Sequence, residues 1–336
     1  MAYLNQSIKT GAISLCNRIV LPPMATGRCS TDGTMEESLF DYYKKESESV
    51  GLVILEHCYI NPAGKAHKGQ VSIADDSNRQ GFQRTAEIIH SRGAKALVQL
   101  SHAGSATSEQ ITGSEVIGPS PVSNPVPHAV SQLEPRGMTS DEIRELKIDF
   151  IKAAKRAVEY GFDGVEIHCA HGYLLNQFYS PLTNHRTDKY GGKRLEDRIR
   201  LTVEIIENLR DMIGAGAMIA VRLGGYDYMD GGTTLEDSSG AGILLEKAGA
   251  DLLDISGGLC GPNNPKSEKT EGYFKEISKA VKENVKIPVM LTGGITKWQT
   301  AESLLQEKYA DLIGVGRTML KDPLWAQKAL KDLENV

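Results

Sequence analysis

The chain has 336 residues, which is enough for one large α/β barrel or for two domains of ordinary size. Its hydrophobic content of 40% and charged content of 24% are ordinary for a globular protein. The formal net charge of −5 argues against non-specific binding of nucleic acid, which requires a basic surface.

Five cysteines are scattered along the chain, and no two of them form a CxxC pair. This pattern supports neither a structural zinc site nor a cysteine-ligated iron–sulfur cluster. The first residues are polar, and no apolar run approaches the roughly 18 residues that a membrane span needs. We therefore expect a cytoplasmic protein with reduced thiols, no signal peptide and no membrane contact.

Short apolar runs alternate with segments of helical periodicity along the chain. The runs predicted as buried strands are 18–21, 51–55, 95–100, 163–168, 218–223, 249–255, 287–292 and 310–315. The predicted helices are 80–90, 139–161, 195–212, 240–247, 274–283 and 298–306, with a last one starting at Asp322-Pro323. Eight strand–helix repeats in a chain of this length predict an α/β fold, a single (β/α)8 TIM barrel formed by residues 1–336 as one domain.

A long irregular segment follows the third predicted strand. Residues 101–138 contain five prolines together with several glycines, serines and asparagines. A loop of that length inside a compact domain is usually functional, so we expect an active-site loop here.

The stretch 163–192 brings polar side chains to the end of the fourth predicted strand. Val165 and Ile167 fall on one face of this strand, and Glu166 and His168 fall on the other. The carboxyl ends of the strands are where β/α enzymes have their active sites, so this stretch is the first candidate for chemistry.

Two imidazoles and a phenol stand close together there, as His168, His171 and Tyr173. A His-x-x-His pair can ligate a metal, although a usual third ligand is not identifiable, or it can donate hydrogen bonds to a bound oxyanion. Tyr173 either donates a proton, because a phenol with a pKa of about 10 is protonated at neutral pH, or packs under a loop.

Glycine-rich loops follow the last two predicted strands, with Gly293 and Gly294 in one and Gly316 and Arg317 in the other. In TIM barrels these two loops often bind a phosphate, because glycines let backbone N–H groups approach the anion. The alternative is that the glycines only form turns and Arg317 lies in solvent. Since no G-x-G-x-x-G follows a strand, a Rossmann-type dinucleotide site is not expected.

Arg222 alternates with Ala220 along the fifth predicted strand, so both side chains point into the barrel if either does. A buried guanidinium needs a negative partner. Glu166, inward by the same alternation, is one candidate, and a ligand that carries or develops negative charge is the other. The spacing alone leaves both open.

Taken together, these motifs resemble the Old Yellow Enzyme family of NAD(P)H:flavin oxidoreductases, nearer its short bacterial type. The resemblance covers almost the whole chain and is most specific in its central run. It rests on Asn17–Met24 (NRIVLPPM), Gln99–Gly104 (QLSHAG), the run 166–192 with HCAHGY and SPLTNHRTDKYGG, and the segment 314–323 with GVGR and DP.

The resemblance implies a bound FMN, with NADH or NADPH as a transient hydride donor. By position it assigns Pro23, Met24 and Ala25 to the isoalloxazine ring and places His57 near it. Gln99 and Arg222 are implied to hold the pyrimidine edge of the flavin, with Arg222 balancing negative charge on the reduced flavin. The residues implied to bind the phosphate are Gly293, Gly294, Gly316 and Arg317.

The implied reaction is a ping-pong reduction of the C=C bond of an activated alkene, such as an α,β-unsaturated carbonyl compound. His168 and His171 are implied to bind the carbonyl oxygen, and Tyr173 to donate the proton. Such bonds stabilise the negative charge that develops on that oxygen.

Three features differ from the family pattern. Ala25 aligns where relatives have Cys or Thr beside the flavin, and His57 aligns where a small residue is common. The sequence ends at Val336, soon after its last predicted helix. From this we expect an FMN-only enzyme without iron–sulfur or second nucleotide domains, and the choice between a monomer and a homo-oligomer stays open.

Two other interpretations remain at this stage. One is a metal-dependent aldolase or isomerase barrel without flavin, with His168, His171 and Glu166 as ligands. The other is a barrel that binds flavin without turnover. The physiological alkene and the choice between NADH and NADPH are not determined by the sequence.

Overall fold

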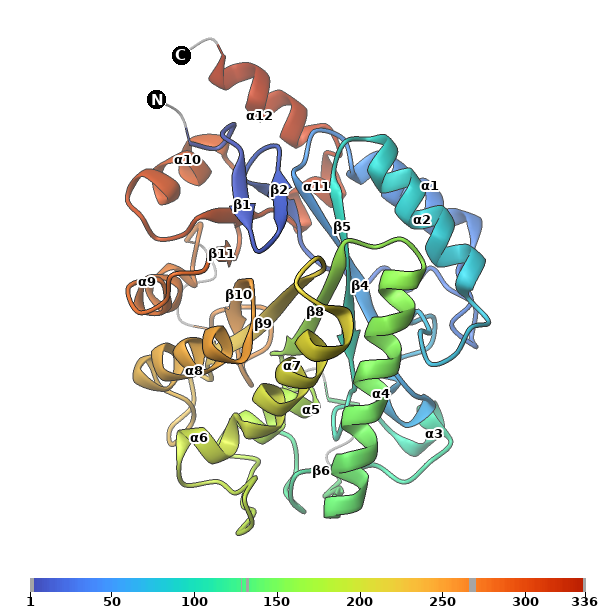
Figure 1. Cartoon of the computed structure of the whole chain (residues 1–336). Coiled ribbons are helices and arrows are strands. Elements are labelled where there is room, and N and C mark those ends of the chain that lie inside the picture. The colour runs from blue at the N-terminus through green and yellow to red at the C-terminus, as the bar shows by residue number, and fades with distance from the viewer. Residues whose placement is uncertain (1–2, 128, 131–132, 266–269, 335–336) are drawn as a thin grey trace.

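Eight parallel strands close into a barrel in the computed structural model, which describes residues 3–127, 129–130, 133–265 and 270–334. They follow one another around the barrel in chain order (Figure 1). The strands are β3 (Ile19–Leu21), β4 (Leu52–Tyr59), β5 (Lys95–Ser101), β8 (Gly164–Cys169), β9 (Met218–Tyr226), β10 (Leu252–Gly257), β11 (Val289–Thr292) and β12 (Leu312–Gly314). The predicted (β/α)8 TIM barrel is confirmed.

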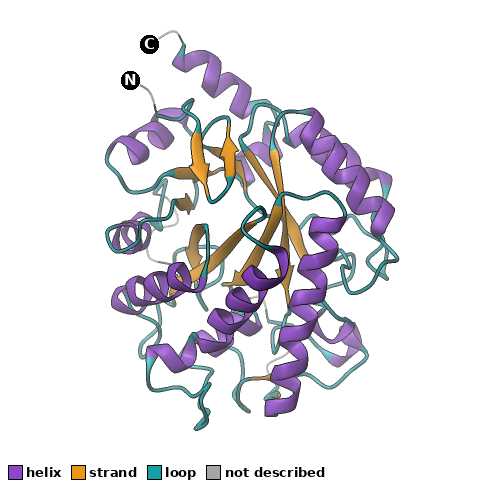
Figure 2. Ribbon diagram, in the orientation of Figure 1, coloured by secondary structure: helices purple, strands orange, loops and turns teal. Residues whose placement is uncertain are grey.

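Helices surround the strands on the outside of the barrel (Figure 2). They are α1 (Glu37–Glu46), α2 (Arg79–Ser91), α4 (Ser140–Glu159), α5 (Leu174–Tyr179), α6 (Leu195–Arg198), α7 (Arg200–Ile213), α8 (Leu235–Ala248), α9 (Lys275–Lys282), α10 (Trp298–Gln306), α11 (Arg317–Lys321) and α12 (Trp325–Leu333). A capping box starts α4: the Glu142 N–H donates to the Thr139 hydroxyl oxygen at 3.2 Å, and the Thr139 N–H donates to the Glu142 carboxylate at 2.7 Å. The last helix starts at Trp325, after a turn in which the Trp325 N–H donates to Asp322 O, and not at the predicted Pro323.

The amino end of the barrel is closed by an antiparallel hairpin of β1 (Ile8–Thr10) and β2 (Ile13–Leu15). Ile13 and Leu15 pack against the apolar side chains that fill the barrel interior. Those interior residues are Val20, Leu52, Ile54, Leu97, Met218, Ala220, Leu252, Met290 and Leu312. Because apolar side chains fill this end, a ligand has access only from the carboxyl ends of the strands.

The segment between β5 and α4 contains only short elements: α3 (Glu109–Thr112), β6 (Ile117–Gly118) and β7 (Arg136–Gly137). It reaches the carboxyl end of β8, where Val126 belongs to a small apolar cluster with Tyr173 and three alanines, Ala66, Ala103 and Ala106. Residues 128, 131 and 132 of the predicted active-site loop lie outside the described residues.

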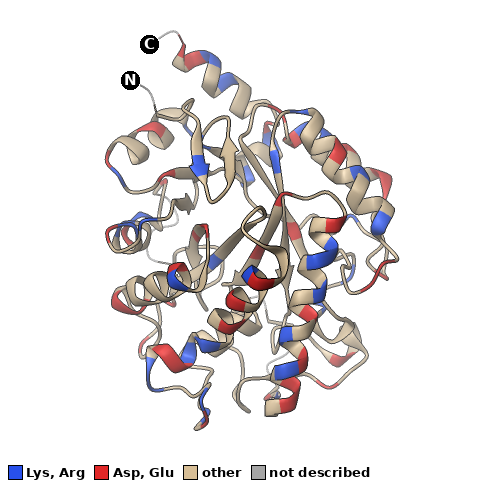
Figure 3. Ribbon diagram, in the orientation of Figure 1, with Lys and Arg blue, Asp and Glu red and all other residues tan. Residues whose placement is uncertain are grey.

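Positive and negative side chains are mixed along the outer helices (Figure 3), in keeping with the modest net charge of −5. Within the described ranges, no helix combines the length and the apolar character that crossing a bilayer requires.

Candidate active site

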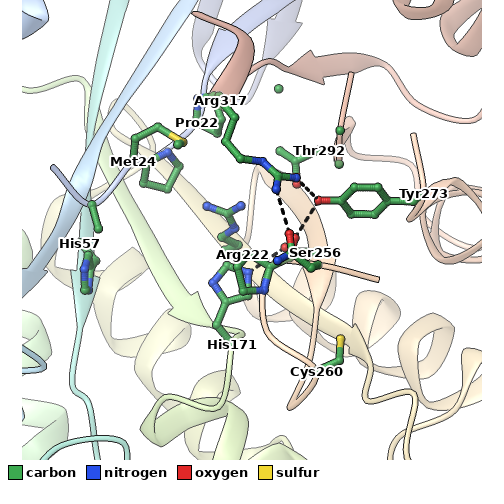
Figure 4. Close-up of a pocket in the computed structure, with 18 of the residues that line it drawn as sticks. Pro22, Met24, His57, His171, Arg222, Ser256, Cys260, Tyr273, Thr292 and Arg317 are labelled. Carbon is green, nitrogen blue, oxygen red and sulfur yellow. Dashed lines mark hydrogen bonds between the residues drawn. The ribbon is translucent and has the colours of Figure 1, made fainter. Parts of the chain in front are cut away.

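A pocket of about 720 Å³ opens at the carboxyl ends of the barrel strands. Its wall brings together all thirteen predicted site residues: Pro23, Met24, Ala25, His57, Gln99, His168, His171, Tyr173, Arg222, Gly293, Gly294, Gly316 and Arg317. They come from segments nearly 300 positions apart in the chain, and Figure 4 shows several of them facing one another across the pocket. Volumes of roughly 300–1,000 Å³ are typical of cofactor and substrate sites.

The two imidazoles lie side by side in the pocket wall, with ring centroids 5.1 Å apart and planes at 87°. His168 is the penultimate residue of β8, in register with Arg222 on β9. His171 follows the strand with a φ of +59°, a left-handed conformation that is uncommon outside glycine. Its backbone N–H donates to Gly257 O at 3.3 Å, and its Nε2 lies 2.8 Å from the hydroxyl of Ser256. These contacts fix the His171 ring beside His168.

Tyr173 precedes the first residue of α5, and its ring lies 4.9 Å from that of His168 at 82°. A second ring, that of His57 on β4, stacks on Tyr173 at 5.4 Å and 19° and lies 6.3 Å from the His168 ring. Burial raises the pKa of the Tyr173 hydroxyl, because a phenolate in an apolar site lacks the solvation of water. The phenol is therefore protonated at neutral pH, as a proton donor must be.

A buried charge cluster forms the floor of the pocket. The Arg222 guanidinium makes an ion pair with Asp254 on the neighbouring strand β10, with Nε and Oδ2 3.2 Å apart. Glu166 instead accepts a hydrogen bond from the Gln99 amide at 2.6 Å. The salt-bridge partner of Arg222 in the described residues is thus Asp254, whereas Glu166, one of the two partners that the spacing left open, bonds to Gln99. Neighbouring parallel strands place Arg222 and Asp254 in direct register, which sequence spacing does not reveal.

The two carboxylates of this cluster compete for one positive charge. Burial raises the pKa of Asp254 above its usual range, against the attraction of Arg222. Burial and repulsion from Asp254 raise the pKa of Glu166 well above its usual range. The cluster therefore holds protons at a higher pH than isolated carboxylates would.

The glycine loops after β11 and β12 have no room for side chains. A Cβ on Gly293 or Gly294 would come within 3.0 or 2.7 Å of the Tyr273 ring, and both glycines have a positive φ. A Cβ on Gly316 would lie 2.5 Å from the Met24 sulfur. Backbone N–H groups in these loops are consequently not shielded by side chains of their own, as a phosphate site requires.

Arg317 is exposed, but its side chain is held at the pocket wall. Its guanidinium donates to the Tyr273 hydroxyl at 2.6 Å and to the Asn263 side-chain oxygen at 3.0 Å (Figure 4). The Tyr273 hydroxyl donates in turn to Pro262 O at 2.8 Å. The side chain is therefore ordered by neutral partners and keeps its positive charge for an anion.

The segment after β3 is tied to β4 by one carboxylate. Glu56 accepts from both the hydroxyl and the N–H of Thr26, at 2.6 and 3.2 Å. Its own N–H donates to the hydroxyl of Tyr43 on α1 at 2.9 Å. Burial raises the pKa of Glu56 to about 7. Because Thr26 directly follows Ala25, this contact fixes the backbone that lines the pocket there.

Sequence reasoning missed the residues that support the site. Asp254, Ser256 and Glu56 are polar residues within or at the end of otherwise apolar strands. A polar residue in such a strand is a sequence signal that could have identified them. Tyr273 and Asn263 lie in an irregular segment, where nothing in the sequence marks them.

The metal-barrel interpretation gains no support from the geometry. In the part of the chain that the structure describes, no three His, Cys, Asp or Glu side chains are placed to hold a metal ion. Glu166, the proposed third ligand, is bonded to Gln99.

A profile of the NADH:flavin oxidoreductase / NADH oxidase family matches residues 4–335. The NADH oxidase of Thermoanaerobacter brockii is 38% identical over 333 residues, which are 97% of this chain and 50% of that protein. The chain thus spans about half the length of this relative. An NADPH dehydrogenase of Halalkalibacterium halodurans is 36% identical, with 96% of this chain and 92% of that protein covered.

Solved structures of related proteins have the same fold as this chain. The Old Yellow Enzyme homologue from Zymomonas mobilis superposes with a TM-score of 0.85 at 28% identity, covering 98% of this chain and 92% of that one. With the match over residues 4–335, the chain belongs to the NADH:flavin oxidoreductase / NADH oxidase family, whose members bind FMN.

Proposed function

We propose that this protein reduces the C=C bond of activated alkenes at the expense of NADH or NADPH. The observation that carries the proposal is the grouping of His168, His171 and Tyr173 in one pocket wall, with ring centroids 5.1 and 4.9 Å apart. FMN, when bound, supplies the redox chemistry by accepting a hydride from NAD(P)H and passing it to the alkene.

The donor set of the pocket fits FMN at both ends. Gln99 and Arg222 would hold the polar edge of the flavin ring. The Gln99 amide donates to Glu166, and the Arg222 guanidinium pairs with Asp254, so both side chains are held in place. Pro23, Met24 and Ala25 would line the ring, since all three face the pocket. The phosphate would be bound by Arg317 and by the loops of Gly293, Gly294 and Gly316, which have no room for side chains.

His168 and His171 would bind the carbonyl oxygen of the substrate. Two ring N–H groups aimed at one oxygen withdraw electron density from the conjugated alkene. They also stabilise the charge that builds on the oxygen as the β-carbon gains hydride. In this role the Ser256 hydroxyl would donate to His171 Nε2, 2.8 Å away, which orients the ring and leaves its proton on Nδ1 for the substrate oxygen.

Tyr173 would deliver the proton to the α-carbon. Its raised pKa keeps the phenol protonated until the developing carbanion approaches it. Stacking against His57 and edge contact with His168 hold its ring on the side of the pocket where the alkene would lie.

An anaerobic titration followed by absorption spectroscopy tests this function. The purified protein is loaded with FMN, reduced with NADH or NADPH, and then mixed with cyclohexenone. We expect the flavin absorption to bleach when the nicotinamide is added and to return after one equivalent of enone is added. Because no oxygen is present, the enone is the only acceptor for the electrons. A protein that bleaches but is not reoxidised by enones would contradict alkene reduction while leaving the flavin assignment intact.

A further inference from the structure

His57 has a fixed place beside the catalytic tyrosine, although the family resemblance predicts a small residue there. It lines the pocket and is 5% exposed. The pairing of β4 with β5 shifts register between Leu55 and Cys58, the interval that contains Glu56 and His57. Such bulges re-aim side chains next to active sites, and here the imidazole stacks on Tyr173 at 5.4 Å.

The hydrogen bonds around Gln70 determine which nitrogen of His57 carries the proton. The Gln70 side-chain oxygen accepts from the Ala66 N–H at 2.7 Å, so its amide nitrogen faces the imidazole. That nitrogen lies 3.1 Å from His57 Nδ1 and can only donate. His57 Nδ1 must therefore be the bare acceptor, and the ring proton is on Nε2.

His67 continues the same chain outward. Its Nδ1 lies 2.9 Å from Lys68 O, and because a carbonyl oxygen only accepts, this nitrogen carries the proton. Its Nε2 is then an acceptor, 3.3 Å from the Nε2–H of His57. Every donor from Gln70 through His57 to Lys68 thus meets an acceptor when both imidazoles are neutral.

This arrangement argues against a proton wire through the two imidazoles. A wire needs the inner nitrogen of His57 to exchange protons with the reacting groups, but Nδ1 is occupied by the amide of Gln70, which is fully buried. Adding a proton to His57 at Nδ1 would also set two donors against each other. The His57 ring is therefore neutral and held in place by hydrogen bonds at both nitrogens, to Gln70 and to His67. We call this arrangement the His57 clamp.

We propose that His57 determines substrate specificity by limiting the width of the pocket beside Tyr173 and His168. Gln70 and His67 are positioning residues that hold it there. Because it concerns the alkene, the inference rests on the proposed function. Substrates that bind would carry only a small substituent on the side facing His57. A pocket with a small residue at this position would also bind substrates with a branched substituent there.

Binding of phenols to the FMN-loaded protein tests the proposal, since a phenol oxygen can occupy the position of the substrate oxygen. Dissociation constants for phenol and its 2-, 3- and 4-tert-butyl derivatives are measured by calorimetry for the wild type and for His57→Ala. We expect His57→Ala to improve the affinity of one derivative relative to phenol by about tenfold or more, since a hydrophobic pocket discriminates even one methylene group by roughly 10–200-fold.

His67→Ala is the matched control, because it also removes an imidazole ring, but the ring of His67 contacts His57 and does not line the pocket. Its effect on the same ratio should be smaller, as Gln70 still holds His57. Equal shifts in both variants, or unchanged ratios in His57→Ala, would overturn the proposal. His57→Asn, which keeps an acceptor for Gln70, repeats the test if His57→Ala does not bind FMN. A wild type that binds FMN but no phenol would contradict the proposed function as well.

The clamp itself has a separate readout in the ¹⁵N NMR shifts of the His57 ring. The wild type should show the proton on Nε2, and Gln70→Glu should move it to Nδ1, because a carboxylate accepts where the amide donates. A wild-type ring protonated on Nδ1 would contradict the clamp.

Discussion

At the scale of single residues, the paired imidazoles and Tyr173 differ in what they do for binding and for chemistry. His168 and His171 lie where they can hold an oxygen, whereas the buried Tyr173 keeps its proton. The roles can therefore be separated by measurements that do not depend on one another.

Replacing either imidazole should weaken the binding of phenols and leave FMN bound. His168→Ala or His171→Ala removes one hydrogen bond to the ligand oxygen, which costs about 1.5 kcal/mol and so about tenfold in affinity. Calorimetry with phenol, and the flavin spectrum as the control for FMN, give both quantities. Wild-type affinity in both variants would remove the oxygen-binding role.

Tyr173→Phe should slow the oxidation of reduced flavin by an enone much more than its reduction by NAD(P)H. Loss of a general acid typically lowers a rate by about 10²–10⁴-fold, whereas hydride transfer from the nicotinamide needs no proton from Tyr173. Stopped-flow absorbance measures the two half-reactions separately. If both slow equally, Tyr173 acts through packing against His57 and His168.

At the level of the elements, the sequence was sufficient to predict the eight barrel strands and insufficient to predict the contacts between neighbouring strands. Strands of a parallel barrel are continuous apolar runs bounded by glycine and proline, so all eight were predicted. The bulge of β4 that aims His57 depends on its neighbour β5 and leaves no local pattern. Likewise, α8 begins at Leu235 and not at the predicted Gly240, because a capping box of Thr234 and Asp237 starts it earlier.

The same limit applies to the site. All thirteen predicted residues share one pocket because motif positions at strand ends converge in any barrel. The partners Asp254, Ser256 and Gln70 were not predicted, since each is chosen by the register between strands or by a turn. The roles of the thirteen residues stay predictions until the variants are measured.

The contact between β4 and the segment after β3 should make stability depend on pH. Burial raises the pKa of Glu56 from 4.5 to about 7, so the folded protein retains a proton that the unfolded chain releases. The stabilisation is complete below pH about 4.5 and is lost as pH rises through about 7. Glu56→Gln should therefore reduce the fall in unfolding free energy between these values, by up to about 3 kcal/mol. Urea unfolding at pH 5 and 7.5 measures the unfolding free energy of both proteins. An equal fall in the wild type and in Glu56→Gln would contradict the raised pKa.

The loop after β5 should be coupled to Tyr173 through Gly172. A Cβ at Gly172 would lie 2.7 Å from that of Val126, and its φ is +71°. Gly172→Ala should therefore destabilise the protein through a clash and through backbone strain of about 1–3 kcal/mol. Adding Val126→Gly, which removes the Cβ as well as both methyl groups of Val126, should relieve only the clash. A double-mutant cycle by urea unfolding separates the two, and a coupling energy of zero would show that the loop moves away freely.

At the scale of the whole molecule, the barrel is closed where its last strand meets its first. β12 and β3 have three residues each and pair through Ile313 with Ile19 and through Gly314 with Val20. The pocket spans this seam, because Met24 follows β3 and Gly316 follows β12 with no space between them. A ligand bound there holds together the two ends of the chain.

FMN should therefore stabilise the folded barrel, and more than riboflavin does. A ligand at 100 times its dissociation constant adds about 2.7 kcal/mol by mass action, and the phosphate of FMN has the additional contact with Arg317. Calorimetric melting temperatures with each ligand should differ in the wild type. In Arg317→Ala the difference should shrink, while riboflavin still stabilises the protein as before. A variant that keeps the full difference would show that the glycine loops bind the phosphate without Arg317, since their N–H groups are the remaining donors on either side of the seam.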